Sequence, residues 1–258
     1  MRGGEMRWVR ATGVVKELGG KRVLDEVDLV LEPSEAVAIV GPNGAGKTTL
    51  LKVLCGLLDS DQGEVQLKGR PIAEWSRREI AGHMAVVPQA APQSFSFSVL
   101  EFVLMGRYAA SRRVVPSTKD VERARGALLQ MEMEELEARS IAALSGGEMQ
   151  RALMARAMVT EGDIWMLDEP TASLDMRHQK STLGAVRAHV DGGSAALAVL
   201  HDLGLVHRYF DRVVVLKEGQ VRAEGKPEEV LDEALVSEVY ETSMRRGQVG
   251  GHTVWVVD

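Results

Sequence analysis

The feature that most constrains this chain is a glycine-rich loop that directly follows a short apolar run. The run AVAIV (36–40) contains no polar residue, which is typical of a strand buried on both faces. Helix-type apolar spacing begins at Thr48. Between them lies a segment with the spacing G-x-x-x-x-G-K-[ST], made of Gly41, Pro42, Asn43, Gly44, Ala45, Gly46, Lys47 and Thr48. A strand, a glycine loop and a helix in this order predict a phosphate-binding loop.

Such a loop has the chemistry to hold the phosphates of a nucleotide. Glycines let backbone N–H groups turn toward an anion, and the N-terminal end of the next helix adds partial positive charge. Lys47 can reach the β- and γ-phosphates, and the Thr48 hydroxyl can ligate Mg²⁺. The alternative is a glycine-rich turn with an incidental lysine, which would not require the flanking strand and helix. We therefore predict that Gly41 to Thr49 bind a nucleotide.

Two carboxylates end a second apolar run, IWMLDE (164–169). They would lie at the carboxyl edge of the sheet, where ligands of parallel sheets bind. Asp168 is a candidate Mg²⁺ ligand, and Glu169 is a candidate base that accepts a proton from an attacking water. His201 follows another apolar run and is a candidate γ-phosphate sensor that also holds the water. Taken alone, each of these positions has a purely structural alternative, and the phosphate loop upstream favours catalysis.

A second candidate anion site lies about a hundred residues after the first. In LSGGEMQR, Ser145 and Glu148 have the S-x-x-E spacing of a helix capping box, with Gly146 and Gly147 between them. A glycine-flanked helix start can bind an anion, although an ordinary helix cap is the alternative. Because the chain already has a phosphate loop, we expect a head-to-tail homodimer in which Ser145 and Gly147 of one copy close over the γ-phosphate held by the other.

Composition excludes some classes of protein. The net charge of −6 and the absence of a basic cluster argue against a nucleic-acid partner. The single cysteine, Cys55, rules out an internal disulfide, and its apolar neighbours predict burial. The longest stretch without acidic or basic residues, 81–100, contains prolines, glutamines and serines, which does not suit a membrane span. The N-terminal residues have no apolar stretch of the signal-peptide kind.

The order of elements predicts an α/β fold. Alternating patterns and turn residues predict strands over 6–40, helix spacing dominates 98–160, and strands and helices alternate thereafter, which implies a mainly parallel sheet with helices on its faces. We expect one domain over 1–258, with an ATP-binding core at 1–90 and 161–225, a helical insert at 91–160 and a tail at 226–258.

These motifs together resemble the ATP-binding cassette (ABC) family of transport ATPases over essentially the whole chain. The resemblance implies a P-loop NTPase core, an N-terminal antiparallel β subdomain and an inserted α-helical subdomain that contains the signature LSGGEMQR. It also implies ATP and Mg²⁺ as cofactors and a nucleotide-sandwich homodimer that drives a membrane partner. The matching positions are GPNGAGKTT for the Walker A loop, Gln89 for the Q-loop glutamine and further Mg²⁺ ligand, IWMLDEP for Walker B, Asp175 for the D-loop and His201 for the switch histidine.

One position departs from the family pattern. The aromatic residue that usually stacks on adenine, near the Gly19-Gly20 turn, is Leu18 in this sequence. A leucine can still pack on a purine face, so Leu18 is included among the predicted nucleotide-binding residues. The resemblance leaves the preference for ATP over GTP open.

Within the family, VLEFVLMGRYAA and HDLGLVHRYFDRVVVLKEGQ are similar to importers of iron-siderophores, haem and cobalamin, although Ala109 replaces a usual proline. This similarity implies a peripheral subunit on the cytoplasmic membrane face. Its partners would be separate transmembrane permease subunits, which 81–100, with Phe95 and Phe97, would contact, and indirectly a periplasmic or extracellular substrate-binding protein. The alternatives are a soluble non-transport cassette, an exporter ATPase and an ATP sensor without turnover.

Overall fold

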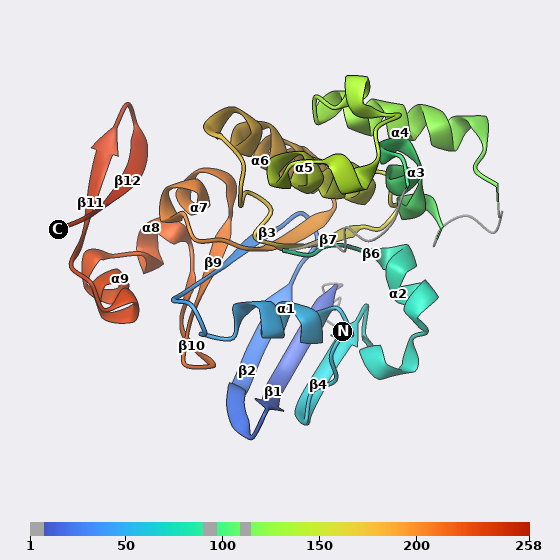
Figure 1. The fold of residues 1–258 in the computed structure, drawn as a ribbon. Helices are drawn as coiled ribbons and strands as arrows, with labels where there is room; N and C mark the ends of the chain where they lie inside the picture. Colours follow the sequence, from blue (N-terminus) through green and yellow to red (C-terminus); the bar gives the residue numbers. More distant parts are fainter. Residues whose placement is uncertain (1–7, 90–96, 109–114) are drawn as a thin grey trace. The chain divides into compact units, whose positions relative to one another are not determined.

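The computed structural model describes residues 8–89, 97–108 and 115–258 of the 258-residue chain (Figure 1). The chain forms two compact units. The first comprises the chain up to Glu74 together with Arg187–Asp258, and the second is Trp75–Val186. The predicted helical insert, 91–160, falls inside the second unit, whereas the finer division into core, insert and tail stays a prediction.

An antiparallel sheet opens the first unit. Its order is β2-β1-β4-β5, formed by β1 (Val9–Leu18), β2 (Lys21–Leu31), β4 (Gln62–Leu67) and β5 (Arg70–Pro71). The strands β1 and β2 are joined by a two-residue turn in which Gly19 and Gly20 both have positive φ, the conformation that favours a tight hairpin. The predicted N-terminal antiparallel subdomain is confirmed.

A mainly parallel sheet forms the centre of the same unit. Strand β3 (Ala36–Val40) lies between β8 (Ala195–Val199) and β9 (Arg212–Lys217) and is parallel to both, while β10 (Gln220–Gly225) pairs antiparallel with β9. All five residues of β3 are fully buried, as the apolar run predicted. Helix α1 (Lys47–Leu54) follows β3 and contains a buried apolar face, and Cys55 just after it is buried too.

The C-terminal tail contains more β structure than the sequence suggested. Its helices are α8 (Pro227–Val230) and α9 (Glu233–Tyr240), and helix α7 (Leu203–Tyr209) precedes β9. Strand β12 (His252–Val257) pairs antiparallel with β11 (Met244–Val249). We missed β11 because MRRGQV has no alternation of apolar and polar residues.

The second unit combines two parallel strands with a group of helices. Strand β6 (Met84–Val87) pairs parallel with β7 (Ile164–Asp168). The helices α3 (Val99–Leu104), α4 (Thr118–Gln130) and α5 (Gly146–Met158) pack against one another through buried side chains such as Val103, Leu128 and Leu153. The other helical elements of the second unit are α2 (Arg77–His83), η2 (Met105–Arg107), η3 (Glu134–Leu136), η4 (Ile141–Ala143) and α6 (Met176–Asp191). The last residues of α6, from Arg187, belong to the first unit. The short helix η1 (Ile72–Glu74) ends the N-terminal segment of the first unit.

The α/β fold class is confirmed. In the first unit β3 pairs parallel with β8 and β9 and β10 pairs antiparallel with β9, and in the second unit β6 pairs parallel with β7. Over the residues that the structure describes, no helix combines the length and the apolar character needed to cross a membrane.

Candidate functional site

The phosphate loop connects β3 to α1, and two of its glycines have no room for a side chain. Gly41 has a φ of 147°, and a Cβ atom there would lie 1.9 Å from the carbonyl oxygen of Leu216. Gly46 has a φ of 102°, and a Cβ atom there would lie 2.6 Å from the carbonyl oxygen of Val23. Both the backbone conformation and the close approach of neighbouring strands therefore require glycine at the two fixed positions of the motif.

The start of α1 suits an anion. Gly46 caps the helix without a side-chain hydrogen bond, and the first turn has no acidic residue, so no carboxylate of the first turn would repel a phosphate at this positive helix end. The Lys47 ammonium is nearly buried and donates to the carbonyl oxygens of Gly41 at 2.8 Å and Pro42 at 2.9 Å. A cation held against the loop adds to the field of the helix terminus.

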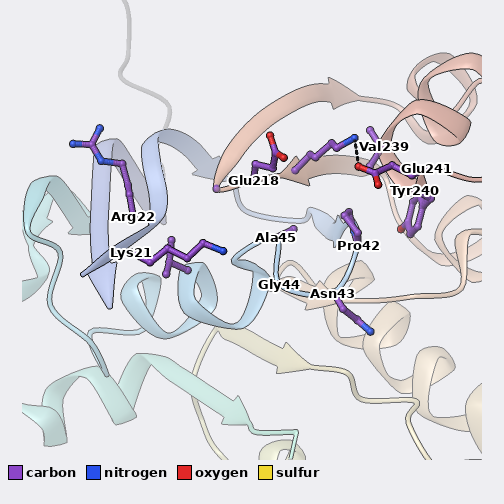
Figure 2. Close-up of a pocket in the computed structure, with 13 residues that line it drawn as sticks. Lys21, Arg22, Pro42, Asn43, Gly44, Ala45, Glu218, Val239, Tyr240 and Glu241 are labelled. Atoms are coloured by element: carbon purple, nitrogen blue, oxygen red, sulfur yellow. Dashed lines mark ion pairs between the residues drawn. The ribbon is translucent and has the colours of Figure 1, made fainter. Parts of the chain in front are cut away.

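A cavity of about 590 Å³ adjoins this loop within the first unit (Figure 2). Its volume is in the range of small-molecule sites. Four segments line it: 21–23 of β2, 42–45 of the loop, 217–219 in the β9–β10 turn and 239–241 at the end of α9. Leu18 is 43% exposed at the end of β1, and its partner across the hairpin turn, Lys21, lines the cavity. The cavity thus lies between the loop and the segment that contains the predicted base-contacting residue.

Much of this cavity wall had no signal in the sequence. Lys21, Arg22 and Tyr240 line the cavity and were not among the predicted site residues. Lys217 and Glu241 form an ion pair of 3.1 Å at the cavity wall, which is dashed in Figure 2. The two residues are 24 positions apart in the sequence and meet only in the folded chain. Such residues are recognised only once tertiary structure places them together.

Around the end of β7, the second unit brings together three predicted site residues and one that was not predicted. Asp168 is buried, and Glu169 is half-buried with a positive φ of 52°. The side-chain amide of Gln89 donates to the Glu169 carboxylate at 3.0 Å. Gln150, in the signature helix, is buried with its amide nitrogen 3.5 Å from the Glu169 carbonyl oxygen, and sequence analysis missed it. The geometry orients the candidate base, whose catalytic role stays a prediction.

The signature helix α5 begins with the predicted capping box, which is confirmed. The Glu148 N–H donates to the Ser145 hydroxyl at 3.3 Å, and the Ser145 N–H donates to the Glu148 carboxylate at 2.7 Å. This hydrogen bond from the Ser145 backbone lowers the pKa of Glu148 below its ordinary value. The helix start is therefore fixed, with Gly146 and Gly147 following the cap.

The D-loop lies against these glycines. A Cβ atom on Gly147 would lie 2.8 Å from the carbonyl oxygen of Ser173, and one on Gly146 would lie 3.7 Å from the Ser173 side chain. Asp175 accepts a hydrogen bond of 2.9 Å from the His178 N–H at the start of α6, which lowers the pKa of the Asp175 carboxyl. Signature and D-loop are thus in direct contact within one unit.

The predicted site residues fall into two groups. The first unit holds the phosphate loop, Leu18 and His201, which is exposed two residues after the end of β8. The second unit holds the remaining predicted residues, namely Gln89, Ser145, Gly146, Gly147, Glu148, Asp168, Glu169 and Asp175. Within each unit the structure brings the predicted motifs to neighbouring elements.

The predicted Mg²⁺ donors fit that ion chemically. Thr48 offers a hydroxyl, Asp168 a buried carboxylate and Gln89 an amide oxygen, and Mg²⁺ prefers such oxygen ligands. Because Gln89 uses its amide nitrogen toward Glu169, its carbonyl oxygen stays available. Among the described residues, no group of three or more His, Cys, Asp or Glu side chains could hold a metal ion.

Comparisons with known proteins agree with this geometry. The sequence profile of the ABC transporter family matches residues 24–172. The hemin import ATP-binding protein HmuV of Pseudomonas putida is 44% identical over 229 residues, which covers 86% of this chain and 88% of that protein. Its namesake in Streptomyces coelicolor is 42% identical over 233 residues, covering 90% of this chain and 82% of the relative.

Solved structures give the same result for the fold. An ATP-binding cassette of an ABC transporter in its ADP conformation superposes with a TM-score of 0.79 at 28% identity, covering 92% of this chain and 99% of that chain. A dimeric ATP-binding cassette in a post-hydrolysis state, bound to ADP and Pi, superposes with a TM-score of 0.75 at 26% identity, covering 85% of this chain and 98% of that chain.

The backbone of β9 lies so close to Gly41 that the loop has no room for a side chain there. Gly41→Ala should weaken ATP binding by more than about tenfold, because the new methyl group would meet the Leu216 carbonyl oxygen and force the loop away from β9. The control is Gly126→Ala in α4, where an added Cβ meets no atom within 4 Å. Equilibrium binding of a fluorescent ATP analogue measures both. Unchanged binding by Gly41→Ala would show that the loop tolerates displacement.

Proposed function

We propose that this chain, which belongs to the ABC transporter family, is the ATP-binding and hydrolysing subunit of an importer for haem or a related iron chelate. The observation that carries the proposal is a phosphate loop with Lys47 against it and a capped signature helix in the same chain. Relatives named as hemin import ATP-binding proteins, aligned over most of their length, support the choice of cargo.

The residues of this chain divide the chemistry between them. The loop at 41–49 holds the phosphates, and Lys47 exchanges its two carbonyl acceptors for phosphate oxygens. Thr48, Asp168 and Gln89 would hold Mg²⁺, which would supply positive charge to offset that of the phosphates. Glu169 accepts a proton from the attacking water, and His201 holds that water near the γ-phosphate. Gln89, hydrogen-bonded to Glu169, keeps the base oriented.

Two copies complete the sites. In the proposed homodimer, the start of α5 in one copy faces the loop of the other, so that Ser145 and Gly147 contact the γ-phosphate. Closing the dimer shields the water from solvent and moves the attached permease subunits. The dimeric cassette structure with ADP and Pi supports this arrangement.

The permease is a separate membrane protein in this proposal, and the chain binds to the cytoplasmic face of the membrane. The proposed contact includes Phe97, which is 38% exposed just before α3, whereas Phe95 and Ala109 lie outside the described residues. A substrate-binding protein on the opposite side of the membrane delivers the cargo and contacts this chain only through the permease.

Reconstitution tests the cargo directly. The chain, purified with its permease in lipid vesicles, should hydrolyse ATP severalfold faster when haem-loaded binding protein is added, because cargo delivery is coupled to dimer closure. The matched controls are the same binding protein without haem, and binding protein loaded with a ferric siderophore or cobalamin. An equal rate with and without haem would contradict haem import, and stimulation by another chelate would reassign the cargo.

A single-atom change tests the base. Glu169→Gln should lower the hydrolysis rate by about 10²- to 10⁴-fold while leaving ATP affinity within about twofold, because an amide cannot accept the proton but keeps the contact with Gln89. Size-exclusion chromatography should then show a dimer that persists in ATP. Glu137→Gln, at a carboxylate that pairs with Arg125 outside the proposed site, is the control and should leave the hydrolysis rate unchanged. Normal turnover by Glu169→Gln would remove Glu169 from the mechanism.

Mixing two inactive variants tests the shared site. Lys47→Ala should lose ATP binding, and Ser145→Arg should bind ATP but obstruct the partner's γ-phosphate. A 1:1 mixture should regain about a quarter of the normal activity, because half of the dimers are mixed and each has one intact site.

Ser76→Arg, which disrupts an equivalent capping box at α2, controls for the loss of a helix cap and should retain activity. A mixture no more active than its separate components would contradict the head-to-tail dimer.

A further inference from the structure

The C-terminal tail reaches back to the phosphate loop. The hydroxyl of Tyr240, the last residue of α9, accepts a hydrogen bond of 3.1 Å from the N–H of Gly41. These residues are 199 positions apart in the chain. Gly41 is buried, and a buried backbone N–H requires an acceptor. The tail therefore supplies the acceptor for the first residue of the loop.

Helix α9 is firmly fastened in this position. Val236 and Val239 are buried, and the Lys217 ammonium at the end of β9 donates to the Glu238 carbonyl oxygen at 2.8 Å and pairs with Glu241 at 3.1 Å. At the other end of the helix, the Arg246 N–H donates to the Glu233 carboxylate at 2.8 Å. The hydroxyl of Tyr240 is thus delivered to the loop by a helix that is anchored at both ends.

Tyr240 stays a neutral acceptor over the physiological pH range. Burial raises the pKa of Tyr240 to about 12, and the hydrogen bond from Gly41 opposes this rise without cancelling it. In Figure 2 the tyrosine and Glu241 lie beside Pro42, on the wall of the cavity that the tail contributes.

Both backbone polar groups of Gly41 are hydrogen-bonded. Its N–H is bound by Tyr240, and its carbonyl oxygen accepts from Lys47 at 2.8 Å. When Lys47 turns to the phosphates, as the proposed function requires, the carbonyl contact is given up. The Tyr240 contact does not involve the nucleotide and can persist. It then becomes a main restraint on the start of the loop.

We infer that Tyr240 is a positioning residue for ATP binding, which acts through the Gly41 N–H and makes the C-terminal tail part of the nucleotide site. The inference rests on the proposed function, since it presumes that the loop binds ATP. It predicts an effect on ATP affinity more than on turnover, because the tyrosine touches the loop and not the reacting atoms.

Tyr240→Phe removes only the hydroxyl and is the critical test. ATP affinity should fall by about three- to tenfold, while kcat at saturating ATP stays within about twofold. Hydrogen exchange of backbone amides in a peptide covering 39–46 should also become faster, which reports on the loop directly. Tyr209→Phe, in α7 with its ring against Arg208, is the matched control and should change neither quantity.

Two further measurements distinguish a positioning role of Tyr240 from a role of the Lys217–Glu241 ion pair and from a purely structural role of the tyrosine. Glu241→Gln weakens the pair with Lys217 but keeps the hydroxyl, so its effect on ATP affinity should be smaller than that of Tyr240→Phe. A larger effect would assign the role to the ion pair and overturn the inference. A Tyr240→Phe protein that melts at a lower temperature but binds ATP normally would show a merely structural tyrosine. If the unmodified chain fails to bind ATP, the proposed function fails instead.

Discussion

The close approach of the loop glycines to neighbouring backbone is the constraint on which the nucleotide site depends. Gly41 lies against the Leu216 carbonyl of β9, and Gly46 against the Val23 carbonyl of β2. The β9–β10 turn adds a hydrogen bond of 3.1 Å from the Gly219 N–H to the Ala45 carbonyl oxygen. Strands from both sheets of the first unit thus fix the loop by backbone contacts. A loop fixed in this way is preorganised, so that little ordering remains to be done when phosphate binds.

The candidate base at the end of β7 is held in a different way. Glu169 adopts a left-handed backbone conformation that a side chain disfavours, and such strain is characteristic of functional positions. Gln89 binds its carboxylate and Gln150 lies beside its carbonyl oxygen, so groups from two other segments hold the residue there. Because Gln150 belongs to the signature helix α5, the signature helix directly contacts the backbone of the candidate base. A displacement of α5 would therefore be felt at Glu169.

What the sequence could reveal depended on how local the signal was. The strand at 36–40, the capping box at Ser145 and the acidic end of β7 each rest on a few consecutive residues, and all are present in the structure. Strand β11 was missed because pairing with β12, not its own pattern, makes it a strand. Tyr240 was missed for a similar reason, since its role depends on a partner 199 residues away. Single-sequence patterns do not encode such pairings.

The contact between signature and D-loop bears on how a dimer would close. A side chain on Gly147 would meet the Ser173 carbonyl oxygen, so the helix start and the D-loop can pack this tightly only with glycine there. Asp175, two residues after Ser173, caps α6 through the His178 N–H and is thereby fixed to a helix. The signature and the D-loop are therefore adjacent within one unit. In the proposed dimer, each copy would present both motifs to its partner together, so a contact at the γ-phosphate and a contact at the D-loop would form side by side.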